Sequence, residues 1–215
     1  MLTHVIAAGK NVGTVRTEAE NLNLAWSPNG LFIAVGDTVR PRISSPPCLT
    51  IAQRNQVSII DCKSAQVIKS VKFTSDVNQL TWNKSSELIF LTTGLGTVEI
   101  LSAPDLQVVH SFQAHLTTCS CIHLEPHGQY ALFIKGIPAH FLPRYLAVGG
   151  TDAIVSVWEV NEFSCVRTFA KLDLPVRAVC FSFDGKYIAA ASEDKVIDIV
   201  RIFGDEFSHA HMAAV

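Results

Sequence analysis

Four short apolar segments, each followed by turn-forming residues, recur along this 215-residue chain. Each segment ends in a large apolar residue, and these residues are Trp26, Trp82, Leu124 and Phe181. Their positions in the chain are separated by intervals of 56, 42 and 57. A recurring interval constrains the fold strongly, because one supersecondary unit must be built several times and stacked.

Two stretches without strand-like alternation account for the two long intervals. Residues 39–53 (VRPRISSPPCLTIAQ) contain three prolines, and residues 130–144 (YALFIKGIPAHFLPR) contain two. The two stretches are equally long, and without them the intervals become 41, 42 and 42. We therefore predict two non-repeat insertions in a chain whose repeat length lies within the range known for propeller blades.

The clearest unit lies near the end of the chain. Residues 176–181 alternate, Asp184-Gly185 follows as a hairpin turn, and residues 187–191 and 196–199 form two further alternating segments. Glycine after aspartate suits a hairpin turn because it tolerates a positive φ angle. Short strands at this period are typical of β-propeller blades. We expect an all-β partial propeller of about four blades over residues 1–215, with a non-repeat tail at 200–215.

The composition excludes several classes of protein. Hydrophobic residues make up 48% and charged residues 17%, which is unlike a disordered chain. The net charge of −2 gives no sign of an electrostatic grip on nucleic acid. The six cysteines lack the spacing of a disulfide scaffold, no signal peptide is evident, and no apolar run reaches the roughly 18 residues of a membrane span. We expect a soluble intracellular protein.

The third unit resembles a WD repeat. Ala114-His115 stands where that family has Gly-His, Thr151-Asp152 fills the tight turn, and Trp158-Glu159 replaces Trp-Asp. The resemblance implies that His115, Asp152 and Trp158 share a buried hydrogen-bond chain with a serine or threonine, which is a structural role. The hydroxyl partner stays open, because Val148 and Gly149-Gly150 occupy its neighbourhood. The other units are degenerate, with Ile60 and Val200 at the tryptophan position.

The amino-acid sequences of several segments are more specific than the repeat pattern. ENLNLAWSPNG at 20–30, VNQLTWN at 77–83, DAIVSVWEV at 152–160 and LDLPVR at 172–177 resemble the third-subunit family of the THO complex. The resemblance covers about residues 12–199, except for the two insertions.

This resemblance implies a nuclear, seven-bladed, non-catalytic scaffold of the THO/TREX assembly, which couples transcription to mRNA packaging and export. Its partners would be other THO/TREX subunits, any association with RNA would be indirect, and no membrane, small-molecule substrate or cofactor would be involved. The alternative is a WD-repeat adaptor of another nuclear or cytosolic complex, such as a chromatin or ubiquitin-ligase assembly.

Five potential metal ligands are clustered before and within one predicted strand. They are His115, Cys119, Cys121, His123 and His127, and alternation puts 119, 121 and 123 on one strand face. The Cys-x-Cys spacing is not that of a zinc knuckle, and no second pair follows. Alignment of Leu124 with Phe181 predicts that Ile122 and Leu124 form the core face, with Cys121 and His123 packing sideways. We therefore predict no metal site.

Catalytic residues are not predicted either. His115, Asp152 and a serine would suggest a hydrolase triad, but the chain has no G-x-S-x-G elbow, and a WD repeat already accounts for the histidine and the aspartate. No phosphate-binding glycine motif is present. We expect a binding protein without turnover.

The sequence also predicts an incomplete copy of a longer repeat protein. Residues 12–17 resemble the closing strand of an earlier unit, and the repeat pattern ends at residue 199. Val39 and Val200 have codons that begin with GT, the usual first bases of an intron, and Gln53 can be encoded by CAG, a usual end. Residues 130–144 could also be a translated intron, with its boundaries at a different position within the codons. We expect read-through introns, and poor solubility of the chain as written, because an unclosed propeller leaves open edges.

Overall fold

The computed structural model of the protein describes residues 2–7, 10–16, 20–38, 55–103, 105–127, 130–132, 140–193, 196–202 and 209–214. Within these ranges every regular element is a β-strand. The expected all-β class is therefore confirmed.

Sixteen of the strands form four antiparallel sheets of four strands each. The first sheet contains β3 (Glu20–Trp26), β4 (Phe32–Thr38), β5 (Asn55–Asp61) and β6 (Gln66–Phe73). The second contains β7 (Val77–Trp82), β8 (Leu88–Thr93), β9 (Thr97–Ser102) and β10 (Gln107–Gln113). The third contains β11 (Cys119–Leu124), β14 (Tyr145–Gly150), β15 (Val155–Glu159) and β16 (Ser164–Phe169). The fourth contains β17 (Val176–Phe181), β18 (Tyr187–Ser192), β19 (Val196–Arg201) and β20 (His209–Ala214).

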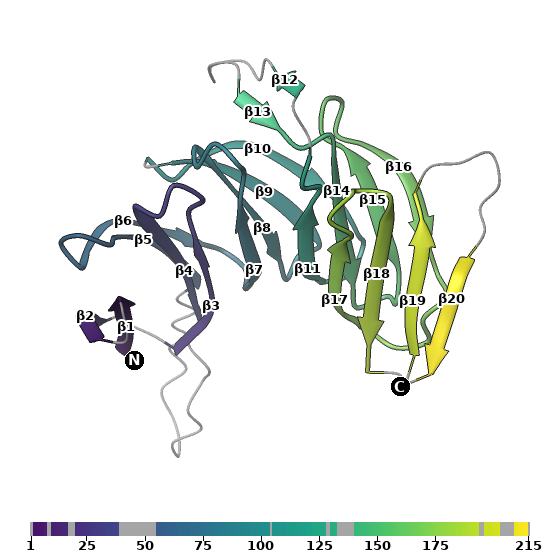
Figure 1. Cartoon of the computed structure of the whole chain (residues 1–215), viewed down its shortest axis with the longest axis horizontal. Helices are drawn as coiled ribbons and strands as arrows, with labels where there is room; N and C mark the ends of the chain where they lie inside the picture. The colour runs from purple at the N-terminus through teal and green to yellow at the C-terminus, as the bar shows by residue number, and fades with distance from the viewer. Residues whose placement is uncertain are drawn as a thin grey trace.

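The four sheets stand side by side in chain order (Figure 1). The first strand of each sheet contacts the first strand of the next, so β3, β7, β11 and β17 form the inner row. The fourth strands lie farthest from this row along each sheet. Radial sheets that meet along their first strands are the arrangement of propeller blades.

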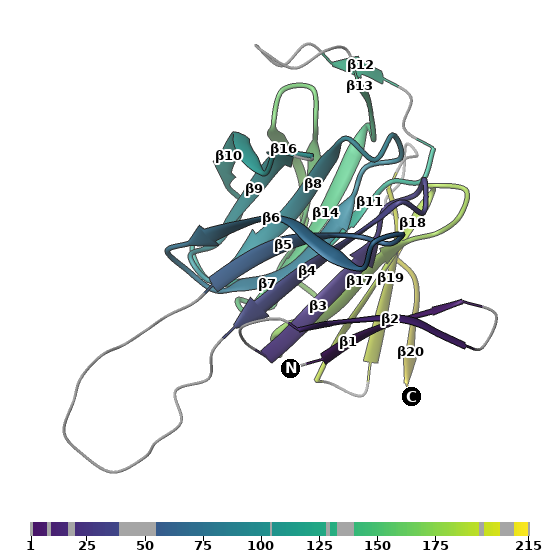
Figure 2. The same cartoon turned by 90° about the vertical axis from the view of Figure 1, so that its left-hand side faces the viewer.

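Two further hairpins lie apart from the four sheets. One joins β1 (Leu2–Ala7) to β2 (Lys10–Arg16), and the other joins β12 (Tyr130–Leu132) to β13 (His140–Leu142). Figure 2 shows the β12–β13 hairpin beyond the ends of the sheets, while β1–β2 lies near the opposite ends. The second predicted insertion therefore includes a short hairpin of its own.

Burial follows the position of a strand within its sheet. Every residue of β8 and β14, the second strands of their sheets, is buried. By contrast, β6, β10 and β16 are mostly exposed. The second and third sheets have a neighbouring sheet against each face, so both alternating sets of side chains on β8 and β14 are removed from water. In the fourth sheet β18 is only alternately buried. The outer strand lacks that cover.

Three hydrophobic clusters fill the spaces between neighbouring sheets. Ile59 and Leu91 belong to the cluster between the first and second sheets, and Phe90 and Leu146 to that between the second and third. The third cluster joins Val157 to side chains of the fourth sheet. Each fully buried aliphatic or phenyl side chain stabilises the fold by roughly 1.5–3 kcal/mol relative to exposure. The interfaces between sheets are therefore the core.

The predicted strand ends agree closely with the structure. Trp26, Trp82, Leu124 and Phe181 are the last residues of β3, β7, β11 and β17. The strands flanking the first predicted insertion, β4 and β5, pair directly with Gly36 opposite Val57. Residues 39–54 lie outside the described residues.

The structure differs from the sequence prediction at the end of the chain. Residues 200–215 were expected to form a non-repeat tail, yet β19 continues to Arg201 and β20 pairs with it as a fourth strand. An outer strand carries a weak sequence pattern, because its residues are mostly exposed in the other sheets. The segment predicted at 12–17 lies largely in β2, which pairs with β1.

Candidate functional site

The third sheet holds a continuous chain of four hydrogen-bonded side chains. His115 comes from the loop before β11, Asp152 from the turn between β14 and β15, and Ser156 and Trp158 from β15. The Nδ1 atom of His115 lies 2.9 Å from Oδ2 of Asp152, and its Nε2 atom lies 2.8 Å from Oγ of Ser156. Trp158 donates its indole N–H to the same Oγ atom at 2.8 Å.

Each hydrogen bond of this four-residue chain can be assigned one donor and one acceptor. A carboxylate only accepts, so Nδ1 of His115 carries the proton and donates to Asp152. Nε2 then accepts the hydroxyl proton of Ser156, whose oxygen accepts from Trp158. His115 and Ser156 are both buried. Since a buried polar group without a partner is costly, this arrangement satisfies the imidazole, the hydroxyl and the indole together.

Gly150 makes room for the bond between His115 and Asp152. A Cβ atom at this position would lie 2.3 Å from Oδ1 of Asp152 and 2.6 Å from Nδ1 of His115. Both distances are shorter than van der Waals contact, so any larger residue would push the pair apart. Gly150 is therefore needed because it leaves space for the hydrogen bond between His115 and Asp152. It has no hydroxyl group, so the hydroxyl partner of His115 must come from another residue.

The structure brings together His115, Asp152 and Trp158 through Ser156, which the sequence pattern did not identify. Ser156 stands two residues before Trp158 in β15, and side chains two apart share a face of a strand. The two-residue spacing from Trp158 could therefore have identified Ser156 from the sequence. Val148 contributes its backbone carbonyl, 3.5 Å from the Ser156 hydroxyl.

Ser156, His115 and Asp152 have the order of contacts of a hydrolase triad. A nucleophile must reach a substrate, yet Ser156 is only 2% exposed and its oxygen already accepts the indole proton of Trp158. The geometry is suited to holding the turn between β14 and β15 against the loop before β11. It is not suited to attack on an external carbonyl.

The zinc candidates of β11 separate in space. A bulge between Cys119 and Cys121 shifts the register against β14. Cys119 consequently joins Ile122 in the cluster between the second and third sheets, whereas Cys121 faces the fourth sheet. The prediction that residues 119, 121 and 123 share a face was therefore wrong for Cys119. Cys121 is also as deeply buried as Ile122, so both faces of β11 are core.

The chemistry of these groups does not favour metal ligation. Burial raises the pKa of the Cys119 thiol and of the Cys121 thiol to about 12, so both stay protonated at neutral pH, whereas zinc takes the thiolate. The Nδ1 atom of His123 accepts a hydrogen bond from the backbone N–H of Phe181 at 3.3 Å. Among the described residues no group of three or more potential ligands is arranged for a metal ion.

Two family models match the chain. The WD domain, G-beta repeat model matches residues 106–159 and 163–199, and the model of the anaphase-promoting complex subunit 4 WD40 domain matches residues 50–127. The sheets, the period and the buried hydrogen-bond chain agree with these matches. The chain is a WD-repeat protein, and each of its four-stranded sheets is a propeller blade.

Within this class, the chain resembles THO complex subunit 3. It is 36% identical to the Arabidopsis thaliana protein of that name over 195 residues, which are 91% of this chain and 52% of that protein. It is 29% identical to the WD repeat-containing protein AAC3 of Dictyostelium discoideum over 83% of this chain and 32% of that protein. It is 27% identical to the protein transport protein sec13 of Aspergillus clavatus over 59% of this chain and 46% of that protein.

The chain spans about half the length of the Arabidopsis relative and about a third of the Dictyostelium relative. Across the described residues, no helix has the length and the hydropathy needed to cross a membrane.

Proposed function

We propose that this chain is a non-catalytic scaffold of a THO-like complex, acting in transcription-coupled mRNA processing and export in the nucleus. The observation that carries the proposal is the 36% identity to THO complex subunit 3 over 91% of the chain. A match of this identity over nearly the whole chain supports a relation to that subunit, beyond the repeat pattern that all WD repeats share. A fold alone would not favour one complex over another.

Protein–protein contact is the mechanism that fits such a scaffold. Blades present loops and exposed outer strands on a rigid core, and a site on a rigid scaffold is held in place for a partner. The proposed partners are other subunits of the complex, with RNA held indirectly through them.

A WD-repeat adaptor of another complex is the second candidate. The match to the anaphase-promoting complex subunit 4 WD40 model favours it, but this match covers residues 50–127 alone. The resemblance to THO complex subunit 3 covers more than twice that length. We therefore rank the adaptor role second.

Affinity purification from nuclear extract tests the proposal. The tagged chain is expected to recover THO subunits, identified by mass spectrometry. Trp158→Ala serves as a misfolded control. Trp158 is partly buried against the core between the second and third blades, and its truncation, which costs up to about 3–5 kcal/mol, should remove partner binding through misfolding. Recovery of a different complex, with no THO subunit, would contradict the proposal and favour the adaptor role.

A further inference from the structure

The last residue of an inner strand packs against the preceding blade at two of the interfaces between blades. Trp82 reaches the first blade, where its indole N–H donates to the carbonyl oxygen of Ala25 at 3.0 Å. Phe181 reaches the third blade, where its ring centroid lies 6.0 Å from that of His123. Both side chains are 6% exposed. Each therefore fills the space beside the next-to-last residue of the preceding inner strand.

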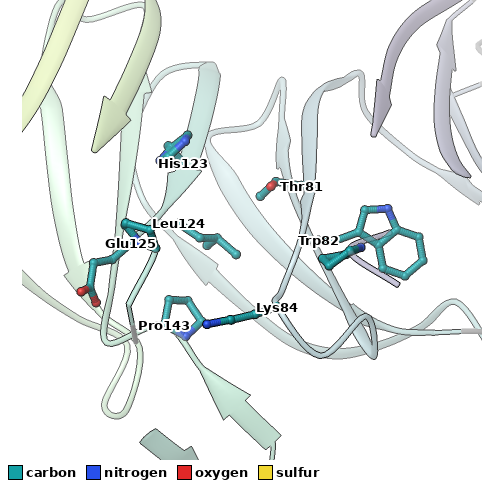
Figure 3. Close-up of a pocket in the computed structure, with 9 residues that line it drawn as sticks. Thr81, Trp82, Lys84, His123, Leu124, Glu125 and Pro143 are labelled. Atoms are coloured by element: carbon teal, nitrogen blue, oxygen red, sulfur yellow. The ribbon is translucent and has the colours of Figure 1, made fainter. Parts of the chain in front are cut away.

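Leu124 holds the same position at the interface between the second and third blades. Its side chain is smaller than an indole or a phenyl ring, and it is only partly buried. The facing next-to-last residue of the preceding inner strand is Thr81. Beside both residues lies a pocket of about 310 Å³. The pocket is lined by Pro28, Thr81, Trp82, Lys84, His123, Leu124, Glu125, Pro126 and Pro143 (Figure 3).

Two charged side chains line this pocket, Lys84 and Glu125. The Lys84 side chain extends toward Pro143, whereas the carboxylate of Glu125 points away from Lys84 (Figure 3). An added Cβ atom on Gly185 would lie 3.0 Å from Oε1 of Glu125, so that carboxylate packs against the turn of the fourth blade. Lys84 is exposed and has no ion-pair partner among the described side chains. A negative group next to a bound ligand would complement it.

We propose that this pocket binds the tryptophan side chain of a partner polypeptide, with an acidic residue beside it in the partner sequence. The volume lies at the lower end of the range of ligand pockets, about 300–1,000 Å³. Tryptophan supplies the aromatic surface that Trp82 and Phe181 supply at the adjacent interfaces. Its N–H would meet the backbone carbonyl of Thr81, which is equivalent to the Ala25 carbonyl that accepts from Trp82.

Buried aromatic side chains of this kind are common anchors of protein interfaces, so the pocket would give the scaffold a defined partner site. The inference rests on the proposed function in one respect only, since it assumes that the chain binds proteins. It does not depend on which complex those proteins form.

Calorimetric titration of the purified chain with blocked tripeptides tests the proposal. The probe is N-acetyl-Asp-Trp-Glu-amide, and the matched control peptide has alanine in place of tryptophan. The tryptophan peptide is expected to bind at least about tenfold more tightly than the alanine peptide, because truncation removes the anchor. Absence of binding, or equal binding of the two peptides, would overturn the proposal.

Two variants locate the binding site. Leu124→Phe places in the pocket the residue type that Phe181 already provides at the next interface, so it should abolish binding without lowering Tm. Lys84→Glu leaves the pocket open and should weaken binding of the acidic peptide several-fold, with a loss that shrinks as salt increases. Unchanged binding by Leu124→Phe would overturn the assignment. Because purified protein and synthetic peptides are used, a negative result leaves the nuclear co-purification unaffected.

Discussion

Ser156 is the residue on which the hydrogen-bond chain of the third blade depends. Ser156→Ala would leave Nε2 of His115 and the indole N–H of Trp158 without partners in a buried site. We expect the free energy of unfolding to fall by about 1–3 kcal/mol, the cost of an unsatisfied buried polar group. Urea denaturation measures this change. The control is Ser111→Ala, which removes an exposed hydroxyl that donates to Glu99 and should cost less than about 0.5 kcal/mol. Equal losses in the two variants would contradict the role of Ser156.

His123 makes stability depend on pH. Burial lowers its pKa below 6.5, and the Nδ1 atom accepts a backbone N–H, which it can do only when it carries no proton. Below pH 6.5 the unfolded chain therefore binds more protons than the folded chain at this residue. The stabilisation that comes from the neutral imidazole of His123 is fully present above pH 6.5. It is lost as the pH falls through the lowered pKa that His123 has in the folded chain.

We expect His123→Gln to lose less stability than the parent chain between pH 7.5 and 5.5, because glutamine can still accept the Phe181 N–H and does not titrate. Urea unfolding across this range measures the effect. Burial also lowers the pKa of His110, so the variant His110→Gln is made in parallel to separate the two contributions. Identical pH profiles of His123→Gln and the parent would exclude His123 as a source.

The four-residue hydrogen-bond chain illustrates what the sequence could predict at this scale. Three of its members stand at fixed offsets that resemble a WD repeat, so they could be named from spacing. Ser156 could not be named in the same way, because Val148 and the two glycines occupy the neighbourhood where the hydroxyl was expected. The faces of Cys119 and Cys121 were also misjudged, since a bulge changes the alternation and leaves no mark in residue types.

Strand bounds could be predicted where turn-forming residues follow the strand. The bounds of β7 and β17 follow from the sequence because each strand ends at a large apolar residue before a polar turn. The outer strand β20 was missed, because side chains of outer strands are mostly in water and follow no strict period. The β12–β13 hairpin lies within an insertion, where no repeat supplied an expectation.

We expect residues 39–53, the first predicted insertion, to be dispensable for the pairing of β4 with β5. Deletion of residues 39–53 joins Thr38 to Arg54 and leaves Thr38, Arg54 and Asn55 as a three-residue loop between the paired residues Asp37 and Gln56. We expect the deletion to keep the β-sheet circular dichroism spectrum. The connection between Asp37 and Gln56 shortens from 18 residues to 3. Because each doubling of loop length costs about 0.6 kcal/mol, the free energy of unfolding should rise by roughly 1.5 kcal/mol. Thermal and urea unfolding measure the difference. Loss of the β-sheet signal would show that the segment belongs to the fold.

At the scale of the whole molecule, the exposed face of the first blade determines how the chain behaves in solution. Trp26 holds the position of Trp82 and Phe181, yet it is 49% exposed, and Leu24 beside it is 56% exposed. No four-stranded sheet among the described residues packs against these two side chains. Two large apolar side chains exposed on one face of a strand favour association, and a neighbouring blade in a closed ring would cover such a face.

We expect the purified chain to self-associate in a concentration-dependent way, as measured by sedimentation velocity. Replacement of Leu24 and Trp26 together by lysine should weaken association by more than about tenfold, because burial of each large apolar side chain contributes roughly 1.5–3 kcal/mol. Ile68→Lys is the matched control, since Ile68 is 49% exposed on the outer strand β6, away from the inner row, and its replacement should leave association unchanged. A parent chain that stays monomeric at all concentrations, or a control that weakens association as much as the double variant, would show that the exposed face of β3 does not control assembly.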